Sequence, residues 1–184
     1  MIKLYLKIFF VTGVFFSLWI SFAGLGRLAT MPQGKALAVS LIFGAIFGLL
    51  LSLIMGTLHI LKVRKIAGES REGDIYATTQ RREIKSALSG DRLFTMLTHY
   101  LKEVARFSLT GLPGVSGKLE AVSRVNLVTF GSRVTITIAQ DERGASAINV
   151  SCKPRLMTTL VDYGESLKIV SDIARYLRES EHRG

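Results

Sequence analysis

Two apolar stretches without a charged side chain dominate the first third of the chain, and a mixed apolar and polar pattern follows them. Residues 8–26 and 36–61, built as helices at about 1.5 Å per residue, extend roughly 28 Å and roughly 39 Å, enough to cross the ~30 Å hydrocarbon core of a bilayer. Pro32 and Gly34 between them suit a tight turn. The pattern predicts a two-helix transmembrane hairpin within residues 1–65. A cleaved signal peptide is the alternative for the first stretch, but the second stretch follows it directly.

Basic residues beside the apolar stretches predict the orientation of the hairpin, because short segments rich in Lys and Arg stay on the cytoplasmic side. Lys3 and Lys7 precede the first span, and Arg27 and Lys35 lie in the turn. Lys62, Arg64 and Lys65 follow the second span. Each outer flank carries more positive charges than the turn once the terminal amine is counted. We therefore expect a multi-pass protein of a bacterial inner (cytoplasmic) membrane with both termini in the cytoplasm. The cluster after the second span is also expected to contact anionic membrane lipid, at about 1 kcal/mol per charge.

Small residues recur at every fourth position in both stretches, which places them on one face of each helix. They are Gly13, Ser17 and Ser21 in the first stretch and Ser40, Gly44, Gly48, Ser52 and Gly56 in the second. Such stripes let helix backbones approach closely in lipid. The sequence leaves open whether they pack the hairpin internally or join separate protomers.

Residues 66–81 have the polar, weakly patterned composition of a linker, and residues 82–180 predict a small α+β domain. We expect a strand at 83–88, a helix capped by Asp91, strands at 118–126, 133–139 and 146–153, and a last helix over 162–179 capped by Asp162. A turn is expected at 141–144. The resulting order is β-α-β-β-β-α, which predicts an antiparallel sheet with both helices on one face.

Composition and motifs mainly exclude classes of function. No charged side chain lies within either span, which argues against an ion path. Cys152 is the only cysteine, so no intramolecular disulfide can form, and its alternating strand position predicts a core residue. The histidines lack metal-ligand spacing. The segment from Gly111 to Lys118 fails the spacing of a phosphate-binding loop. We therefore expect no metal, no cofactor and no enzymatic activity.

The net charge of +10 and the element order of the domain resemble a double-stranded-RNA-binding domain. Such domains grip phosphates through basic residues at the start of the last helix. Here that start carries Asp162 and Glu165, which have the wrong sign. We expect no nucleic-acid partner.

One polar cluster remains as a candidate contact site for a partner or ligand, at the junction between the last strand and the last helix. It consists of Arg155, Asp162, Tyr163 and Gly164. Arg155 offers a cation, and the helix start offers free N–H donors. A well-capped connection without a ligand is the alternative.

The same junction resembles small uncharacterised bacterial α+β domains whose last strand ends in a Ser-x-Pro/Arg element and whose final helix begins with an Asp-x-Gly turn. The segment from Ser151 to Arg155 and the turn from Asp162 to Gly164 carry this resemblance, which extends over residues 83–177. It implies a fold and no activity.

These observations favour a non-enzymatic accessory or scaffold subunit, anchored by the hairpin, that presents its cytoplasmic domain to a protein partner. The alternative is a self-assembling homo-oligomer, including a pore, packed through the small-residue stripes. Membrane lipid is the other expected partner.

Overall fold

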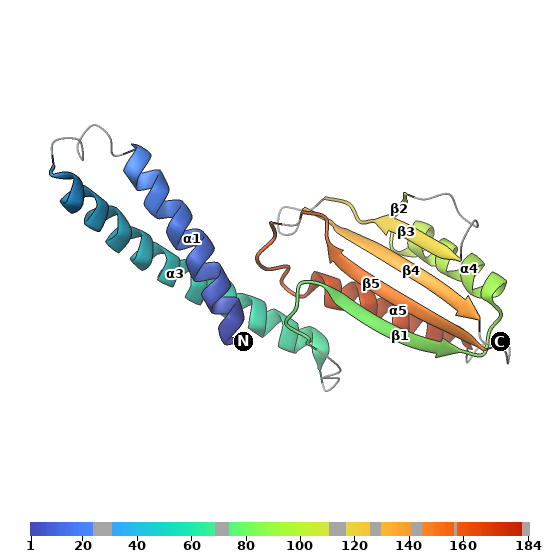
Figure 1. Cartoon of the computed structure of the whole chain (residues 1–184). Coiled ribbons are helices and arrows are strands. Elements are labelled where there is room, and N and C mark those ends of the chain that lie inside the picture. The colour runs from blue at the N-terminus through green and yellow to red at the C-terminus, as the bar shows by residue number, and fades with distance from the viewer. Residues whose placement is uncertain are drawn as a thin grey trace. The chain divides into compact units, whose positions relative to one another are not determined.

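The computed structural model describes residues 1–23, 31–68, 74–110, 117–125, 130–140, 145–156 and 158–181. The chain divides into two compact units, Met1–Leu61 and Lys62–Gly184 (Figure 1). Parts of the predicted turn and linker, and the whole predicted 141–144 turn, lie outside the described residues, as do residues 111–116 of the rejected phosphate-loop segment.

The first unit contains two long helices, α1 (Ile2–Ala23) and most of α3 (Gln33–Ala67), which lie side by side (Figure 1). Both are long and apolar enough to cross a membrane, by length and composition. Each extends beyond the predicted apolar span at its N-terminal end, because Lys3, Lys7 and Lys35 are compatible with helix although they end the uncharged stretch. Large apolar side chains such as Phe15 and Ile42 point outward and are more than half exposed.

The two helices touch through their backbones at the small residues. A Cβ added to Gly48 would lie 2.8 Å from the carbonyl oxygen of Phe9, and one added to Gly44 would lie 2.6 Å from that of Gly13. Ser52 donates a hydrogen bond from its hydroxyl to the carbonyl of Tyr5 at 2.7 Å. The glycines therefore set the distance between the helices, and a buried hydroxyl adds a polar link across the interface.

The second unit contains an α+β domain with a five-stranded antiparallel sheet, which confirms the predicted class. Its strands are β1 (Gln80–Ser86), β2 (Ser108–Leu109), β3 (Lys118–Val122), β4 (Ser132–Gln140) and β5 (Ser146–Pro154), in the spatial order β1-β5-β4-β3-β2. Its helical elements are α4 (Gly90–His99), the π-helix η1 (Tyr100–Val104) and α5 (Glu165–Glu181). Several bounds differ from the prediction: β1 begins at Gln80 and ends at Ser86 rather than spanning 83–88, β3 ends at Val122 rather than at residue 126, and α5 begins at Glu165 rather than at residue 162. β2 is an additional strand, too short for a period-2 pattern.

The core of the domain lies between one face of the sheet and the helices, which both cover that face (Figure 1). Every second side chain is buried in β5 from Ser146 to Cys152 and in β4 from Ser132 to Ile136, and the register pairs Val134 with Cys152 and Ile136 with Val150. Leu97 of α4 and Ile173 of α5 are fully buried against this face. Each such side chain contributes about 1.5–3 kcal/mol by leaving water. Cys152 is thus a core residue, as predicted.

The helix after β1 begins differently from the prediction. Its N-cap is Ser89, which makes no side-chain capping bond, and Asp91 lies in the first turn. The expected cap by Asp91 is therefore wrong. The helix starts earlier because Gly90 can adopt helical geometry. The Asp91 carboxylate still interacts favourably with the positive end of the helix dipole.

Replacing Gly48 by Ala should destabilise the hairpin, because the new Cβ meets backbone atoms of α1 at under 3.0 Å. Overpacking of this kind costs about 1–3 kcal/mol, although Ala is the better helix former. Gly34→Ala is the matched control, since a Cβ there meets nothing within 4 Å. Thermal unfolding in detergent micelles, followed by the fluorescence of the single tryptophan, Trp19 in α1, measures the effect. A Gly48→Ala protein as stable as the control would contradict the backbone contact.

Candidate functional site

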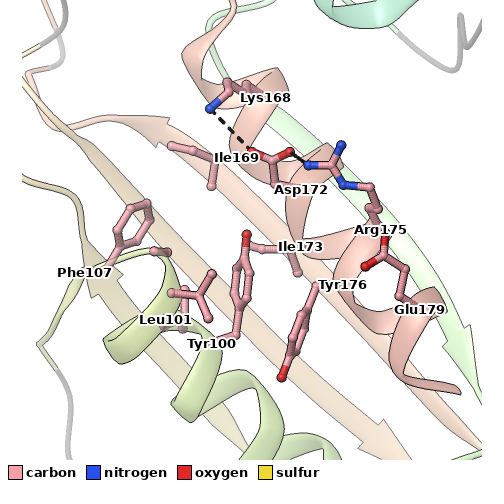
Figure 2. Close-up of a pocket in the computed structure, with 12 residues that line it drawn as sticks. Tyr100, Leu101, Phe107, Lys168, Ile169, Asp172, Ile173, Arg175, Tyr176 and Glu179 are labelled. Atoms are coloured by element: carbon pink, nitrogen blue, oxygen red, sulfur yellow. Dashed lines mark hydrogen bonds and ion pairs between the residues drawn. The ribbon is translucent and has the colours of Figure 1, made fainter. Parts of the chain in front are cut away.

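A groove of about 500 Å³ opens on the α+β domain between η1 and α5 (Figure 2). Its walls come from two elements that are far apart in the sequence. The segment around η1 contributes Tyr100, Leu101, Val104, Ala105 and Phe107, and α5 contributes Lys168, Ile169, Asp172, Ile173, Arg175, Tyr176 and Glu179. Leu101 and Ile173 form part of the core beneath it.

The η1 wall owes its shape to a change of helix type. The N–H of Ala105 donates to the carbonyl of Tyr100 at 2.8 Å, five residues earlier, instead of to the residue four earlier. Arg106 follows with a φ of 55°, in the left-handed region that residues other than glycine seldom adopt. The helix therefore widens and stops, and the chain turns into β2. Such π-turns occur frequently at functional sites.

Two stacked tyrosines span the seam between the helical elements. The rings of Tyr100 and Tyr176 lie 4.5 Å apart between centroids with an interplanar angle of 29°. Both side chains are half-buried. An aromatic pair of this geometry contributes about 0.5–1.5 kcal/mol beyond its buried area, so the pair also helps to hold η1 beside α5.

The α5 wall carries a row of charges in which Asp172 is central (Figure 2). Its carboxylate contacts the guanidinium of Arg175 at 2.5 Å and the ammonium of Lys168 at 3.6 Å. The two basic side chains are about two-thirds exposed, and exposed pairs of this kind contribute at most about 1 kcal/mol each. Their main effect is to fix the position of the carboxylate at the rim.

The environment of the groove keeps Tyr100 protonated. Burial is the main cause that raises the pKa of its phenol above 10.0, and the negative charge of Asp172 adds to it, while Arg175 acts in the opposite direction. Tyr100 is therefore a neutral hydroxyl at physiological pH and not a base. The groove offers aromatic surface, phenol hydroxyls and fixed charges, and these groups suit the non-covalent binding of a partner.

The predicted site at the strand-helix junction is only partly assembled. Asp162 is buried, and its carboxylate accepts hydrogen bonds from the backbone N–H groups of Gly164 and Ser166, each at 3.1 Å. A bound anion would need the same N–H donors. Because the Asp162 carboxylate already occupies them, it caps α5, as predicted. The side chain of Arg155 is exposed and makes no hydrogen bond or ion pair with the residues that the structure describes.

Tyr163 and Gly164 form the turn that precedes α5, with φ values of 50° and 78°. Gly164 packs on the last turns of α3, where an added Cβ would lie 2.8 Å from Ile66 and 3.3 Å from Val63. This close approach and the positive φ both require glycine. The turn therefore joins the start of α5 to the end of α3 within the second unit.

The basic cluster after the second apolar stretch lies in the last turns of α3, and all three of its side chains are exposed. The ammonium of Lys62 lies 5.3 Å from the centroid of the Tyr163 ring, and Arg64 donates a hydrogen bond to the Tyr76 hydroxyl at 3.3 Å. The side chain of Lys65 makes no hydrogen bond or ion pair with the residues that the structure describes. These residues are thus accessible, and two of them are partly positioned by tyrosines.

The predicted packing residues of the hairpin lie mostly between α1 and α3. Gly13, Ser40, Gly44, Gly48, Ser52 and Gly56 are buried, and Ser17 and Ser21 are half-buried. Ser17 contacts Gly44, because its hydroxyl occupies the place that a Cβ on Gly44 would need. Ser21 donates a hydrogen bond along its own helix to the carbonyl of Ser17 at 2.9 Å.

The chemistry of the remaining polar groups gives no sign of a metal centre or a nucleophile. Among the described residues, no three His, Cys, Asp or Glu side chains lie close enough together to hold a metal ion. Burial raises the pKa of the Cys152 thiol to about 12. The thiol is therefore protonated and unreactive at physiological pH.

Comparison with known proteins adds little to this description. No protein-family model and no curated protein matches the chain. Among solved structures, the crystal structure of Ara h 8.0201 is similar over 58% of this chain and 98% of its own, with a TM-score of 0.38 and 10% identity. A solution NMR structure of a protein from Thermobifida fusca is similar over 58% of this chain and 95% of its own, with a TM-score of 0.38 and 12% identity. Neither resemblance is close enough to support an inference about function.

Replacing Asp162 by Ala should lower the stability of the domain by about 1–2 kcal/mol, the usual loss for a helix cap. Arg155→Ala is the matched control from the same junction and should leave stability unchanged, because its side chain makes no hydrogen bond or ion pair with the described residues. Urea unfolding of the full chain in detergent, read by hydrogen exchange in α5, separates the two. Equal stability of both variants would show that Asp162 is not a structural cap.

Proposed function

We propose that the chain is a non-enzymatic, membrane-anchored accessory or scaffold subunit that presents its α+β domain to a protein partner in the cytoplasm. The observation that carries the proposal is the tyrosine-lined groove between η1 and α5, in a domain that follows two helices apolar enough to span a membrane.

The apolar surface of α1 and α3 supports anchoring in a membrane. Exposed side chains such as Phe15, Phe22 and Ile46 cover their outer faces. Apolar surface left in water costs roughly 25 cal/mol per Å², and large contiguous patches mark contact with membranes or partners. A bilayer removes this cost along both helices. The basic residues at the end of α3 support a cytoplasmic position for the domain.

The make-up of the groove supports a protein segment as its occupant. Tyr and Arg are the residue types most enriched at energetically important interface positions, and Tyr100, Tyr176 and Arg175 lie together here. Lys168 and Glu179 lie about 16 Å apart along α5, at opposite ends of its exposed wall. The expected occupant places an apolar or aromatic side chain on the tyrosines, with an acidic group toward Lys168 and a basic group toward Glu179.

A homo-oligomer, including a pore, is the second candidate, and one observation favours it. An apolar groove of about 300 Å³ runs along the hairpin surface, lined in part by Gly13, Ser17, Ser21 and Ser40. A helix of a second copy would fit such a smooth groove closely. This candidate needs no foreign partner, which distinguishes it from the first.

The membrane orientation is testable with single cysteines in a Cys152→Ala background. Gln33→Cys, at the first residue of α3, should react with a membrane-impermeant maleimide on intact cells. Ala87→Cys, exposed in the α+β domain, should react only after the membrane is permeabilised. The opposite pattern would place the domain outside the cytoplasm, and labelling of both sites in intact cells would mean that the chain does not span as a hairpin.

Partner binding is testable by placing a photo-crosslinking amino acid at Val104, in the groove, and at Thr137, on the uncovered face of the sheet. In the native membrane, the Val104 position should crosslink one foreign protein, and Tyr176→Ala should reduce the yield at least tenfold, since truncation of an interface hot spot costs about 2 kcal/mol or more. The Thr137 position is the matched control and should give no such product. Crosslinking only to a second copy of the chain would favour the homo-oligomer.

A further inference from the structure

One end of the sheet in the α+β domain has large apolar side chains that are exposed. Val125 follows the end of β3, Phe130 precedes β4 and Leu156 follows β5, and their exposed fractions are 62%, 52% and 44%. Among the described residues of the Lys62–Gly184 unit, the other large apolar side chain exposed to this degree is Val104, in the tyrosine groove. Exposed apolar surface in this domain is therefore gathered at two places, the groove and this end.

Backbone contacts around Gly131 bring the three positions together. The N–H of Arg155 donates to the carbonyl of Gly131 at 2.9 Å, and a Cβ added to Gly131 would lie 3.3 Å from the carbonyl oxygen of Arg124. Arg124 and Arg155 are the chain neighbours of the exposed valine and leucine. Phe130 precedes Gly131 and has a φ of 54°, in the region that residues other than glycine seldom adopt. The three apolar side chains therefore emerge close together, from a backbone that is held in place.

Basic side chains flank these apolar ones along the chain. They are Arg124, Arg133, Lys153 and Arg155, and all four are exposed. Arg133 and Lys153 are cross-strand partners on the uncovered face of the sheet. A pair of like charges directly opposite each other destabilises a sheet. The stability of the fold does not explain this pair, whereas a surface of negative charge would relieve the repulsion.

Glu120 of β3 is the acidic side chain nearest to this pair on the uncovered face. Its carboxylate forms an ion pair with Lys118 at 2.5 Å. The hydrogen bond from Lys118 is the main cause that lowers the pKa of Glu120, and the charges of Arg133 and Lys153 lower it further. The acidic residues at the start of α5 lie on the covered face. One carboxylate is thus shared among three cations, and an excess of positive charge remains at this end.

This end of the sheet is also the end at which the chain enters the domain from α3 (Figure 1). The register aligns Gln80, the first residue of β1, with Cys152 near the end of β5, and Cys152 with Val134 near the start of β4. Gly164, in the turn before α5, packs on the last turns of α3 within the same unit. If α3 crosses the membrane as proposed above, the anchor holds this end of the domain closest to the lipid headgroups.

We propose that this end of the sheet docks on the anionic surface of the membrane that anchors the chain. We call it the sheet tip, and it consists of Val125, Phe130 and Leu156 with Arg124, Arg133, Lys153 and Arg155. The basic side chains contact lipid phosphates, and the apolar side chains enter the boundary between headgroups and acyl chains. Apolar patches with polar rims mark contact surfaces, and clustered Lys and Arg attract anionic lipid. The docking rests on the proposed membrane anchor, and it fixes the direction in which the tyrosine groove opens.

The test places one tryptophan reporter in the full-length chain, in vesicles made of equal parts of phosphatidylglycerol and phosphatidylcholine. Trp19→Phe removes the native tryptophan, and Phe130→Trp introduces the reporter. Phosphatidylcholine brominated near its headgroup should quench this reporter at least threefold more strongly than a reporter introduced by Thr137→Trp. Thr137 is the matched control position, because it is exposed on the same uncovered face but farther along β4, away from the sheet tip.

The contribution of charge is tested with two matched double variants. Arg133→Gln combined with Arg155→Gln should lower the quenching at Phe130→Trp to the level of the control position. Lys85→Gln with Arg92→Gln removes the same charge from exposed positions at the other end of the sheet and should leave the quenching unchanged. Vesicles of phosphatidylcholine alone should also reduce it, because the attraction requires anionic lipid.

Equal quenching at the two reporter positions, equal quenching in the two kinds of vesicle, or an equal effect of the two double variants would each overturn the docking. Leu156→Trp is the second reporter if Phe130→Trp does not fold. A photo-reactive amino acid at Phe130 that crosslinks a protein in the native membrane, without quenching by lipid, would assign the sheet tip to a protein partner and overturn the proposal.

Trp19 of the original chain tests the membrane anchor separately. It lies in α1 and is more than half exposed, so lipid brominated in its acyl chains should quench it when α1 lies in the bilayer. Quenching of Trp19 without quenching at the sheet tip would refute the docking and leave the anchor intact, whereas the loss of both would refute the anchor itself.

Discussion

The sheet of the α+β domain buries only one of its faces, and most other features follow from this constraint. Two helical elements have to share that face, because the opposite face carries Thr137, Asn149 and charged residues that remain in water. Where two helices share a face, a seam is left between them. Tyr100 and Tyr176 lie in this seam, with their rings stacked at 4.5 Å. The groove is therefore a product of the way the core is covered, and no insertion or separate loop is needed to build it.

Hydrophobic periodicity was enough to predict the elements that one-sided burial imposes. Val134, Ile136 and Ile138 alternate in β4, and the fourfold spacing of small residues marks the faces that bring α1 and α3 together. Other elements leave no such pattern. A two-residue strand such as β2 is shorter than one period, and the π-turn at Tyr100 depends on a hydrogen bond to Ala105 that residue types do not specify. The helix start at Gly90 was missed because Asp91 is an equally acceptable cap by composition.

The candidate sites show a different limit of sequence reasoning. An acidic residue before a helix marks a cap, and free N–H groups at the same place mark an anion site, so one pattern supports both hypotheses until the partners of Asp162 are seen. The sequence did not identify Tyr176 as a site residue, because a tyrosine at this spacing suits either the buried or the exposed face of a helix.

The two edges of the sheet have a consequence for the behaviour of the domain in a crowded layer. If the hairpin anchors the domain in a membrane as proposed, the domain is confined to a thin layer of solution beside the bilayer, where its local concentration exceeds that in the bulk. Open strand edges then become sites of edge-to-edge aggregation. One edge here is β2, which offers only two residues, and the other is β1, which carries Arg81, Arg82, Glu83 and Lys85. Both edges resist pairing with a second copy, so copies anchored close together would resist edge-to-edge aggregation.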